Sequence, residues 1–332
     1  MNLLAIESSC DETSAAVLIN NQICSNVVAA QLIHEQYGGV VPELASRAHQ
    51  QHIVPVVERA LADAKLPKTS LDAIAFTRGP GLLGSLLVGA SFAKALALGL
   101  QVPLIEVNHM QAHVLAHFIG DNNPAFPFLC LTVSGGHTQI VLARAPLDME
   151  VIGQTQDDAV GEAFDKSAKL LNLPYPGGPL IDRYARAGNP LAFKLPLGEM
   201  PGLDFSFSGI KTAILYFLRD QTKANPDFID QNLTDICASV QYTLVQMLLA
   251  KLKRAARETG IRDIAIAGGV SANSGLREAL QKTGHELGWR VFIPAFEYCT
   301  DNAAMIAIAA KFKFEQGDFV GQDVSPLPRM TF

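Results

Sequence analysis

The chain has 332 residues, of which 49% are hydrophobic and 17% charged, and its formal net charge is −6. Its length suits two domains or one large duplicated unit, and its apolar content excludes global disorder. The net negative charge argues against a generally basic nucleic-acid binder, although a local basic patch is compatible with it.

The cysteines and the N-terminal residues bear on the cell compartment. Five cysteines are scattered along the chain without a C-x-x-C pair, which excludes a disulfide scaffold and a cysteine zinc cluster. The chain opens directly on a strand-like run, without a basic segment or a cleavage signal. We therefore expect a cytoplasmic protein.

The first half of the chain predicts alternating strands and helices. Two apolar runs, residues 3–6 and 15–19, flank a polar tip and indicate a hairpin. The elements expected after it are a strand at 24–30, a helix at 47–64, a strand at 71–77, a helix at 84–98, a strand at 104–107 and a helix that begins at His109.

The same pattern restarts near residue 127. Strands are expected at 128–133, 139–143 and 150–152, followed by a helix at 162–171. Residues 174–210 are rich in proline and glycine, which indicates an insertion with little regular structure. The elements expected after it are long helices over 229–260, a strand at 264–267, a helix at 274–287, a strand at 290–293, a helix at 302–314 and an irregular tail.

One order of strands and helices therefore occurs twice, which predicts an α/β protein of two similar halves with a cleft between them. We expect an N-terminal lobe over residues 1–125 and a C-terminal lobe over 126–325. The second lobe would carry the insertion, at about 174–260, and residues 318–332 would form the tail.

Residues 82–100 are apolar enough to suggest a membrane span. Lys94 interrupts the stretch, glycines and serines dilute it, and no basic cluster flanks it, so we interpret it as a buried helix. Apolar residues occur on nearly every face of this helix, which implies cover from two sides. The second cover is either the helix at 47–64 or a partner chain, because a large exposed apolar patch is rare on a monomer.

Glycine-rich turns stand where expected strands end, at 133–138 and 268–273, with a third at 176–179. Glycines let a backbone approach a ligand closely, and free N–H groups at the start of a helix favour phosphate. Together the turns indicate a nucleotide site. The alternative is that polar residues of turn 268–273 only cap a helix. Neither G-x-G-x-x-G nor a Walker loop is present.

A histidine pair, His109 and His113, stands at i, i+4 near the start of an expected helix. This spacing puts both rings on one face, within reach of a single metal ion. Asp301 is a candidate third ligand, and two histidines with one carboxylate suit non-haem iron or catalytic zinc. The alternative is an ordinary solvated or capping pair. His49 and the other histidines without such a companion are interpreted as surface or core residues.

An acidic tip, Glu7, Asp11 and Glu12, matches the polar turn 134–138 of the second half. Clustered carboxylates near a phosphate site hold Mg²⁺ or act as a base, and a solvated hairpin tip is the alternative. Cys10 lies beside them without a basic partner, so we assign it no nucleophilic role.

Short motifs along the whole chain form one set. They are ESSCDET at 7–13, GGVVPELASR at 38–47, GPGL at 79–82, HMQAH at 109–113, VSGGHT at 133–138, GEAFDK at 161–166, YPGGP at 175–179, DFSFSG at 204–209, GGVSAN at 268–273 and CTDN at 299–302. The set resembles the bacterial branch of the TsaD family, the tRNA threonylcarbamoyladenosine transferase subunits once called glycoproteases. Ser8 stands where many members have threonine, and it keeps the hydroxyl.

The resemblance implies a duplicated actin/hexokinase/Hsp70-like (ribonuclease H-like) fold, with mixed sheets, flanking helices and a helical insertion in the second half. It implies transfer of the threonylcarbamoyl group from threonylcarbamoyl-AMP to N6 of adenosine 37 in tRNAs that read codons beginning with A. By motif, His109, His113 and Asp301 correspond to the ligands of one Fe²⁺, which zinc can replace. Asp11 or Glu12 would take the amine proton. The corresponding substrate-binding positions are Thr132, Val133, Ser134, Gly135, Gly136, Asp165, Gly178, Asp182 and Asn273.

The resemblance also implies partners. These are the tRNA substrate, a shorter TsaB-like paralogue that docks on helices at about 50–64 and 84–98, and a TsaE-like ATPase subunit. Candidate tRNA contacts, for which ordinary surface charge is the alternative, are Arg47, Lys166, Lys169, Arg183, Arg186, Lys194 and Lys211.

Other functions are compatible with the same fold. A nucleotide-sensing ATPase or chaperone-like module would use the fold for closure, with ATP as the nucleotide. A sugar or acetate kinase leaves the metal triad unexplained. A metallopeptidase lacks the glutamate of H-E-x-x-H.

Overall fold

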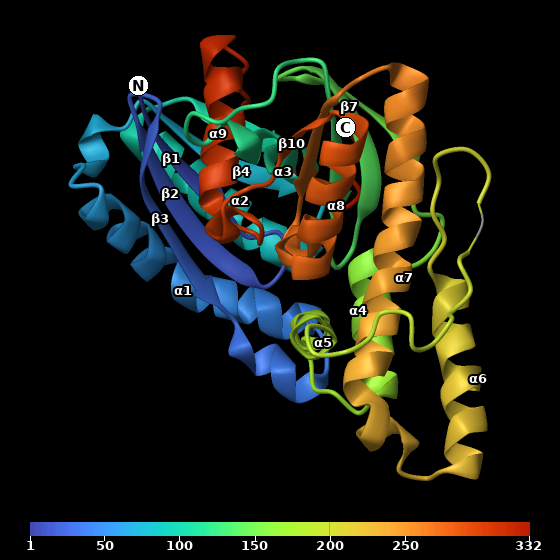
Figure 1. The fold of residues 1–332 in the computed structure, drawn as a ribbon. Coiled ribbons are helices and arrows are strands. Elements are labelled where there is room, and N and C mark those ends of the chain that lie inside the picture. The colour runs from blue at the N-terminus through green and yellow to red at the C-terminus, as the bar shows by residue number, and fades with distance from the viewer. Residues whose placement is uncertain (199) are drawn as a thin grey trace. The chain divides into compact units, whose positions relative to one another are not determined.

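The computed structural model describes residues 1–198 and 200–332 and divides into two compact units (Figure 1). The first unit contains Met1–Pro124, Arg144–Met149 and Pro294–Phe332, and the second contains Ala125–Ala143 and Glu150–Ile293. The boundary near residue 124 agrees with the expected one. The C-terminal end differs, because Pro294–Phe332 pack with the first unit and not with the second lobe.

The first unit is built on a five-stranded sheet of order β3-β2-β1-β4-β5. Its strands are β1 (Asn2–Glu7), β2 (Glu12–Ile19), β3 (Gln22–Ala30), β4 (Ala73–Gly79) and β5 (Leu104–Asn108). β1 is antiparallel to β2 and parallel to β4. Both β1 and β4 are buried over nearly their whole length, which is typical of strands covered on both faces of a sheet.

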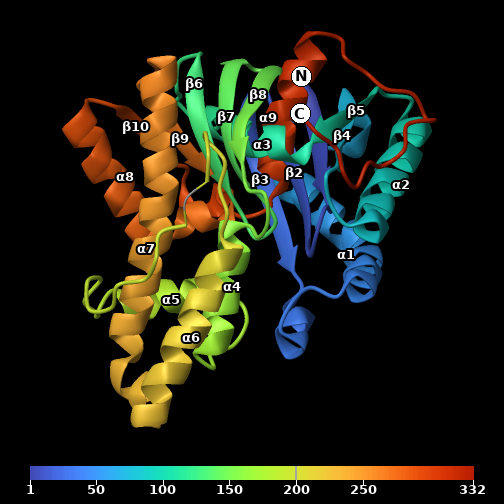
Figure 2. The same cartoon turned by 90° about the vertical axis from the view of Figure 1, so that its right-hand side faces the viewer.

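Helices cover both faces of this sheet (Figure 2). α1 (Pro42–Asp63) and α2 (Leu83–Leu100) contact each other and share one hydrophobic core with Leu4, Ile6 and Phe76. α9 (Ala303–Glu315) contacts all five strands and also α3 (His109–Leu115). Successive side chains of a strand point to opposite faces, so Leu3 and Ala5, which are fully buried, belong to the side that α9 covers.

The second unit repeats the sheet with the order β10-β9-β6-β7-β8. Its strands are β6 (Phe128–Val133), β7 (Thr138–Ala145), β8 (Asp148–Gln154), β9 (Asp263–Ala267) and β10 (Arg290–Phe292). β6 is antiparallel to β7 and parallel to β9, as β1 is to β2 and β4. The expected duplication of strand order is therefore confirmed.

Five helices accompany the second sheet, and they contribute to one large core (Figure 1). They are α4 (Val160–Leu170), α5 (Gly177–Ala185), α6 (Ser208–Ala224), α7 (Phe228–Thr259) and α8 (Ser274–Leu287). α5 and α6 were not expected. α5 begins on a Pro-Gly-Gly-Pro run because the first helical turn tolerates proline, whose missing N–H has no partner there in any case. α6 buries only Ile210, Ile214 and Leu218, one residue per turn.

Among the residues that the structure describes, two helices, Leu83–Leu100 and Phe228–Thr259, are long and apolar enough to cross a membrane by length and composition alone. Of the most apolar 18-residue stretch of α7, 67% is buried, as in a core helix. Of the corresponding stretch of α2, only 33% is buried. The expected buried helix is therefore covered by this chain on one side only, and α1 does not provide a complete second cover. Leu83, Leu87 and Leu98 are exposed on its outer side.

The tail after α9 is irregular, as expected, but it is bound to the first unit along its length. Val320 forms a bridge to Leu104, and the backbone N–H of Leu327 donates to the Arg78 carbonyl. The side-chain amide of Asn108 donates to the carbonyl of Thr331. The tail therefore lies against the strand ends from which α3 starts.

Candidate functional site

The start of α3 is fixed by Asn108, the residue that ends β5. Its side-chain oxygen accepts hydrogen bonds from the backbone N–H groups of Met110 and Gln111, as an N-cap does. The helix therefore begins at His109, and four residues later His113 lies on the same face. The expected helix is only two turns long, but its cap defines where both rings point.

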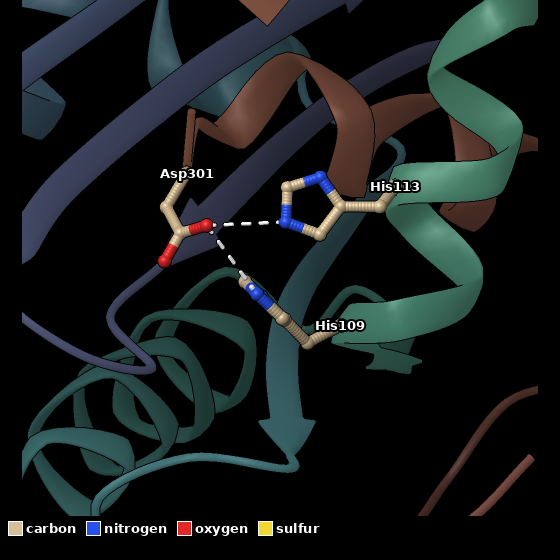
Figure 3. Close-up of side chains that lie close together, drawn as sticks. All are labelled: His109, His113 and Asp301. Carbon is tan, nitrogen blue, oxygen red and sulfur yellow. Dashed lines mark hydrogen bonds and ion pairs between the residues drawn. The ribbon is translucent and has the colours of Figure 1, made fainter. Parts of the chain in front are cut away.

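The structure brings the three predicted metal ligands together within the first unit (Figure 3). Oδ1 of Asp301 lies 3.1 Å from Nε2 of His113 and 3.4 Å from Nε2 of His109. Asp301 stands directly before Asn302, whose side chain accepts from the N–H of Met305 and caps α9. Two capped helix starts, of α3 and α9, therefore aim their side chains at one point.

Burial and charge together shift the pKa values of His109 and Asp301. Burial disfavours the charged form of His109, yet the carboxylates of Asp301 and Glu7 raise the pKa of His109 well above its usual value. Burial likewise opposes ionisation of Asp301, but the two histidines hold the pKa of Asp301 far below its usual range. Without an ion, the charges of the His109 ring and the Asp301 carboxylate stabilise each other.

The spacing of the donor atoms fits one metal ion. Bonds of about 2.0–2.2 Å from nitrogen and carboxylate oxygen place neighbouring ligands about 3.0–3.5 Å apart. The Asp301–histidine distances of 3.1 and 3.4 Å lie in this range, and the three ligand atoms lie within 4.8 Å of one another. His109 is 7% exposed and His113 1%, so an ion would lose much of its water on entry.

Glu7 does not lie at a solvated hairpin tip, which was one of the two interpretations of this residue. Its side chain is 0% exposed, and its Oε2 lies 3.1 Å from Nδ1 of His109. Thr77 donates to the same oxygen, and the N–H of Ser9 donates to Oε1. Burial opposes the charge, but His109 holds the pKa of Glu7 below its usual value.

The remaining acids of the β1–β2 turn are partly exposed. Burial first, and then the charges of Asp301 and Asp11, raise the pKa of Glu12 well above its usual value. The same influences raise the pKa of the Cys10 thiol, which is consistent with no nucleophilic role. Glu12 therefore lies in the electrostatic field of Asp301.

His49 holds this turn from α1, a role that its lone position in the sequence did not indicate. Its ring is fully buried, with Nδ1 2.8 Å from Oγ1 of Thr13 and Nε2 3.0 Å from the Cys10 carbonyl. Ser85 of α2 donates to the same carbonyl. Two helices thus anchor the turn that follows Glu7.

The turn between β6 and β7, in the second unit, is closed by Ser134. Its hydroxyl accepts from the N–H of His137, and its own N–H donates to the His137 carbonyl. Gly135 and Gly136 are exposed, and a Cβ added to either would meet nothing within 4 Å. Neither glycine has a left-handed φ. The fold would therefore accept a side chain at both positions, and close approach of a ligand to the backbone is a reason to have none.

Gly268 is required by the fold itself. Its φ is +87°, and a Cβ there would lie 2.5 Å from the carbonyl oxygen of Val133. Thr132 and Val133 are fully buried in β6, so their contribution to a ligand site would come from the backbone. Packing therefore requires glycine at position 268, whereas it does not require glycine at positions 135 and 136.

The other predicted substrate-binding residues already have partners in the second unit. Asp165 accepts from the N–H groups of Gly177 and Gly178 at the start of α5. Oδ1 of Asp182 accepts from both the N–H and the hydroxyl of Ser274. Asn273 caps α8, which was the alternative interpretation of its turn. Burial raises the pKa of Asp165 against the two N–H donors.

Comparison with known proteins decides the family. The family model described as TsaD, tRNA N6-adenosine threonylcarbamoyltransferase, matches residues 22–308. The chain belongs to the TsaD family. A TsaD relative of this name from Cytophaga hutchinsonii is 64% identical over 99% of this chain and 96% of its own length. One from Christiangramia forsetii is 63% identical over 100% of this chain and 98% of its own.

Solved structures share the fold of this TsaD chain. Full-length HypF in a phosphate- and nucleotide-bound form superposes with a TM-score of 0.65 at 14% identity, covering 96% of this chain and 47% of HypF. The activator of the 2-hydroxyisocaproyl-CoA dehydratase from Clostridium difficile gives 0.55 at 12% identity, covering 97% and 99%. At such identities the likeness concerns the fold alone.

Proposed function

We propose that this chain transfers the threonylcarbamoyl group from threonylcarbamoyl-AMP to N6 of adenosine 37 in tRNAs that read codons beginning with A. Membership of the TsaD family supports the reaction, since relatives at 48–64% identity over nearly the whole chain have the name of this transferase. The observation that carries the site is the convergence of His109, His113 and Asp301.

The donor is a mixed anhydride of a carbamic and a phosphoric acid, so its carbonyl reacts with an amine directly. The adenine N6 attacks this carbonyl, AMP leaves, and no covalent enzyme intermediate is needed. Asp11 or Glu12 is the proposed acceptor of the amine proton. A carboxylate of raised pKa, such as Glu12, is the stronger base once it is ionised.

The nucleotide of the donor would bind in the second unit. The exposed N–H groups of Gly135 and Gly136 suit phosphate oxygens, and the absence of side chains there leaves room for close approach. Asp165, Asp182 and Asn273 would accept or donate hydrogen bonds to the ribose and base, with Gly178 leaving space beside them. The bonds that they already make hold them in position for this.

His109, His113 and Asp301 would hold one Fe²⁺ per chain, with zinc as a replacement that the same donors accept. A divalent ion bound there polarises a carbonyl or phosphate oxygen and stabilises developing negative charge. The chain itself contributes the two capped helix starts that fix the three donors. The burial of both histidines would keep water away from their side of the ion.

The decisive experiment measures metal content and transfer together. The purified chain, combined with its partner proteins, receives threonylcarbamoyl-AMP and tRNA, and the modified nucleoside is quantified. His113→Ala should lose both the ion and transfer, while the exposed His285→Ala should keep both. Stoichiometric metal in His113→Ala would rule out the proposed centre, and normal transfer by a metal-free chain would rule out its role.

We propose local contact between tRNA and basic side chains of the chain, one of them in the first unit and the others in the second. Arg47, Lys166 and Arg186 are paired with Glu43, with Asp158 and Glu162, and with Asp182, so their charges are partly neutralised. The exposed candidates in which no ion pair is seen within the described residues are Lys169, Arg183, Lys194 and Lys211. These four are the stronger candidates.

We propose that the outer faces of α1 and α2 bind the shorter TsaB-like paralogue, with a TsaE-like ATPase joining the pair. The support is the row of exposed apolar side chains Val54, Leu83, Leu87 and Leu98. Partner protein, and not a membrane, would cover this row, in keeping with the Lys94 inside α2 and a cytoplasmic location. Pull-down of the paralogue by the wild-type chain, and its loss on a charge substitution within the row, tests this surface.

A further inference from the structure

Packing alone does not explain why Glu7, a charged side chain, is buried. The side chain is the last of β1 and is 0% exposed. Burying a carboxylate costs several kcal/mol unless partners compensate, and an apolar residue of similar size is often at least as stable in such a place. The one titratable partner in contact with Glu7 in the described chain is His109, a predicted metal ligand.

We propose that Glu7 is a positioning residue that keeps the proton of the His109 ring on Nδ1 and leaves Nε2 free to bind the metal ion. The inference rests on the proposed metal centre and deepens it. Glu7 itself does not bind the ion in this arrangement, because His109 stands between it and Asp301.

The hydrogen bonds give the direction of this effect. Glu7 accepts from the Thr77 hydroxyl at 2.6 Å and from the N–H of Ser9, and an ionised carboxylate can only accept. Nδ1 of His109, 3.1 Å from Oε2, must therefore carry the hydrogen. A neutral imidazole has a single N–H, so Nε2 then has the lone pair, and Nε2 is the atom that faces Asp301 at 3.4 Å.

Thr77 and Ser9 make the arrangement rigid. Thr77 lies on β4, which pairs with β1 in parallel. Its hydroxyl donates to Oε2 of Glu7, the same oxygen that accepts the hydrogen bond from Nδ1 of His109. Ser9 Oγ lies 3.2 Å from the same Nδ1. A carboxylate behind a histidine ligand both orients the ring and makes it a stronger donor to the metal.

The test compares metal affinities of the full chain. Metal-stripped wild type, Glu7→Gln, Glu106→Gln and His109→Ala are titrated with Zn²⁺, and with Fe²⁺ without oxygen, against a chromophoric chelator. Glu7→Gln keeps the shape and removes the charge, and its affinity should fall about 10–100-fold. Glu106 on β5 is, like Glu7, an ion-paired carboxylate, and its side chain is 15% exposed. It binds Arg78 and Lys313 and no predicted metal ligand, so Glu106→Gln should bind metal like wild type.

The control variants distinguish a failure of the proposed metal centre from a failure of the proposed role of Glu7. His109→Ala must lose binding, and wild-type affinity in that variant would refute the metal centre itself. If His109→Ala loses the ion while Glu7→Gln binds as tightly as wild type, the centre stands and the role of Glu7 is refuted. If Glu106→Gln weakens binding equally, the effect is general destabilisation, which also refutes it.

A second measurement reports the ring directly. Nitrogen NMR of the metal-free chain, recorded at a pH above the pKa of His109, should show the neutral ring with its hydrogen on Nδ1, and the Glu7→Gln spectrum should show a larger share of the Nε2–H form. If Glu7→Gln does not fold, Thr77→Val takes its place and should weaken metal binding severalfold, with recovery in Thr77→Ser, which keeps the hydroxyl. Unchanged affinity in Thr77→Val would overturn the proposal.

Discussion

The two sheets have the same strand order, yet the turns after their central strands β1 and β6 have opposite chemistry. The β1–β2 turn has acidic side chains, with buried Glu7 at its start and Asp11 and Glu12 beyond it. The β6–β7 turn has two exposed glycines and offers its backbone. The sheet fixes where each turn lies and leaves its residues free to differ, so duplication of one frame can yield a side-chain site and a backbone site.

The largest expected effect comes from a substitution that removes one proposed metal ligand and leaves the proposed nucleotide site unchanged. Asp301→Asn keeps the shape of the residue but loses its charge, so metal affinity should fall by at least about 100-fold and transfer should stop. Metal analysis, with calorimetry of a non-hydrolysable threonylcarbamoyl-adenylate analogue, checks this. Nucleotide affinity within about threefold of wild type is expected for a site that uses other residues. An equal fall in both affinities would show that the two sites are not separable.

The next test changes the backbone site through its glycines. Gly268→Ala should lower the free energy of unfolding by about 1–3 kcal/mol, because the residue has a left-handed φ and its Cβ would collide with the Val133 carbonyl. Gly136→Ala should leave that free energy unchanged, since its Cβ meets nothing. Its affinity for the adenylate analogue should nevertheless fall about 10-fold. Urea unfolding and calorimetry distinguish the two, and unchanged affinity in Gly136→Ala would remove that turn from the nucleotide site.

A smaller effect concerns assembly on the outer side of the first unit. Leu87→Glu or Ser91→Glu places a charge on an exposed position of α2 and should weaken binding of the paralogue at least 10-fold. Ala90 is unsuitable for this purpose, because it is 2% exposed and a charge there would disrupt the core. Leu215→Glu on α6 is the matched control, and light scattering reports the complex. A complex that survives Leu87→Glu places the interface elsewhere.

The smallest effect concerns the insertion, which the first unit lacks. Asp157 accepts from the N–H groups of Phe207 and Ser208 and from the hydroxyls of Ser206 and Ser208, at the start of α6. Partial burial opposes the charge, but these donors lower the pKa of Asp157 below its usual value. The stabilisation is therefore present above the unfolded-state pKa and is lost as the pH falls through the folded-state pKa.

Exposure of the Asp157 side chain limits the size of this contribution to below about 1 kcal/mol. Asp157→Asn should lower the urea midpoint at pH 7, and the difference from wild type should shrink as the pH falls through the folded-state pKa, where the wild-type carboxyl also loses its charge. A variant as stable as wild type at pH 7 would show that these bonds do not hold α6.

The sequence was most informative where chemistry and periodicity coincide. The strands around both turns and the helix with His109 and His113 were predicted, because apolar alternation and i, i+4 spacing are local signals. For Glu7 a solvated hairpin tip stayed open as an alternative, since local sequence cannot show that His109 of α3 lies against the end of β1. α6 escaped prediction because its anchor, Asp157, lies about 50 residues earlier in the chain. The duplicated strand order was evident, whereas the return of Pro294–Phe332 to the first unit had no local signal.

The discontinuity of the first unit has a consequence for biosynthesis. Asp301 is made 188 residues after His113, and nearly all of the second unit lies between them. At translation rates of about 5–20 residues per second, this delay amounts to about 10–40 s. Throughout it the β1–β5 sheet lacks α9, so one apolar face is uncovered on the nascent chain and is a target for holding chaperones. The proposed ion would therefore be captured only after the second unit has left the ribosome, and metal loading would be a late step in the life of the polypeptide.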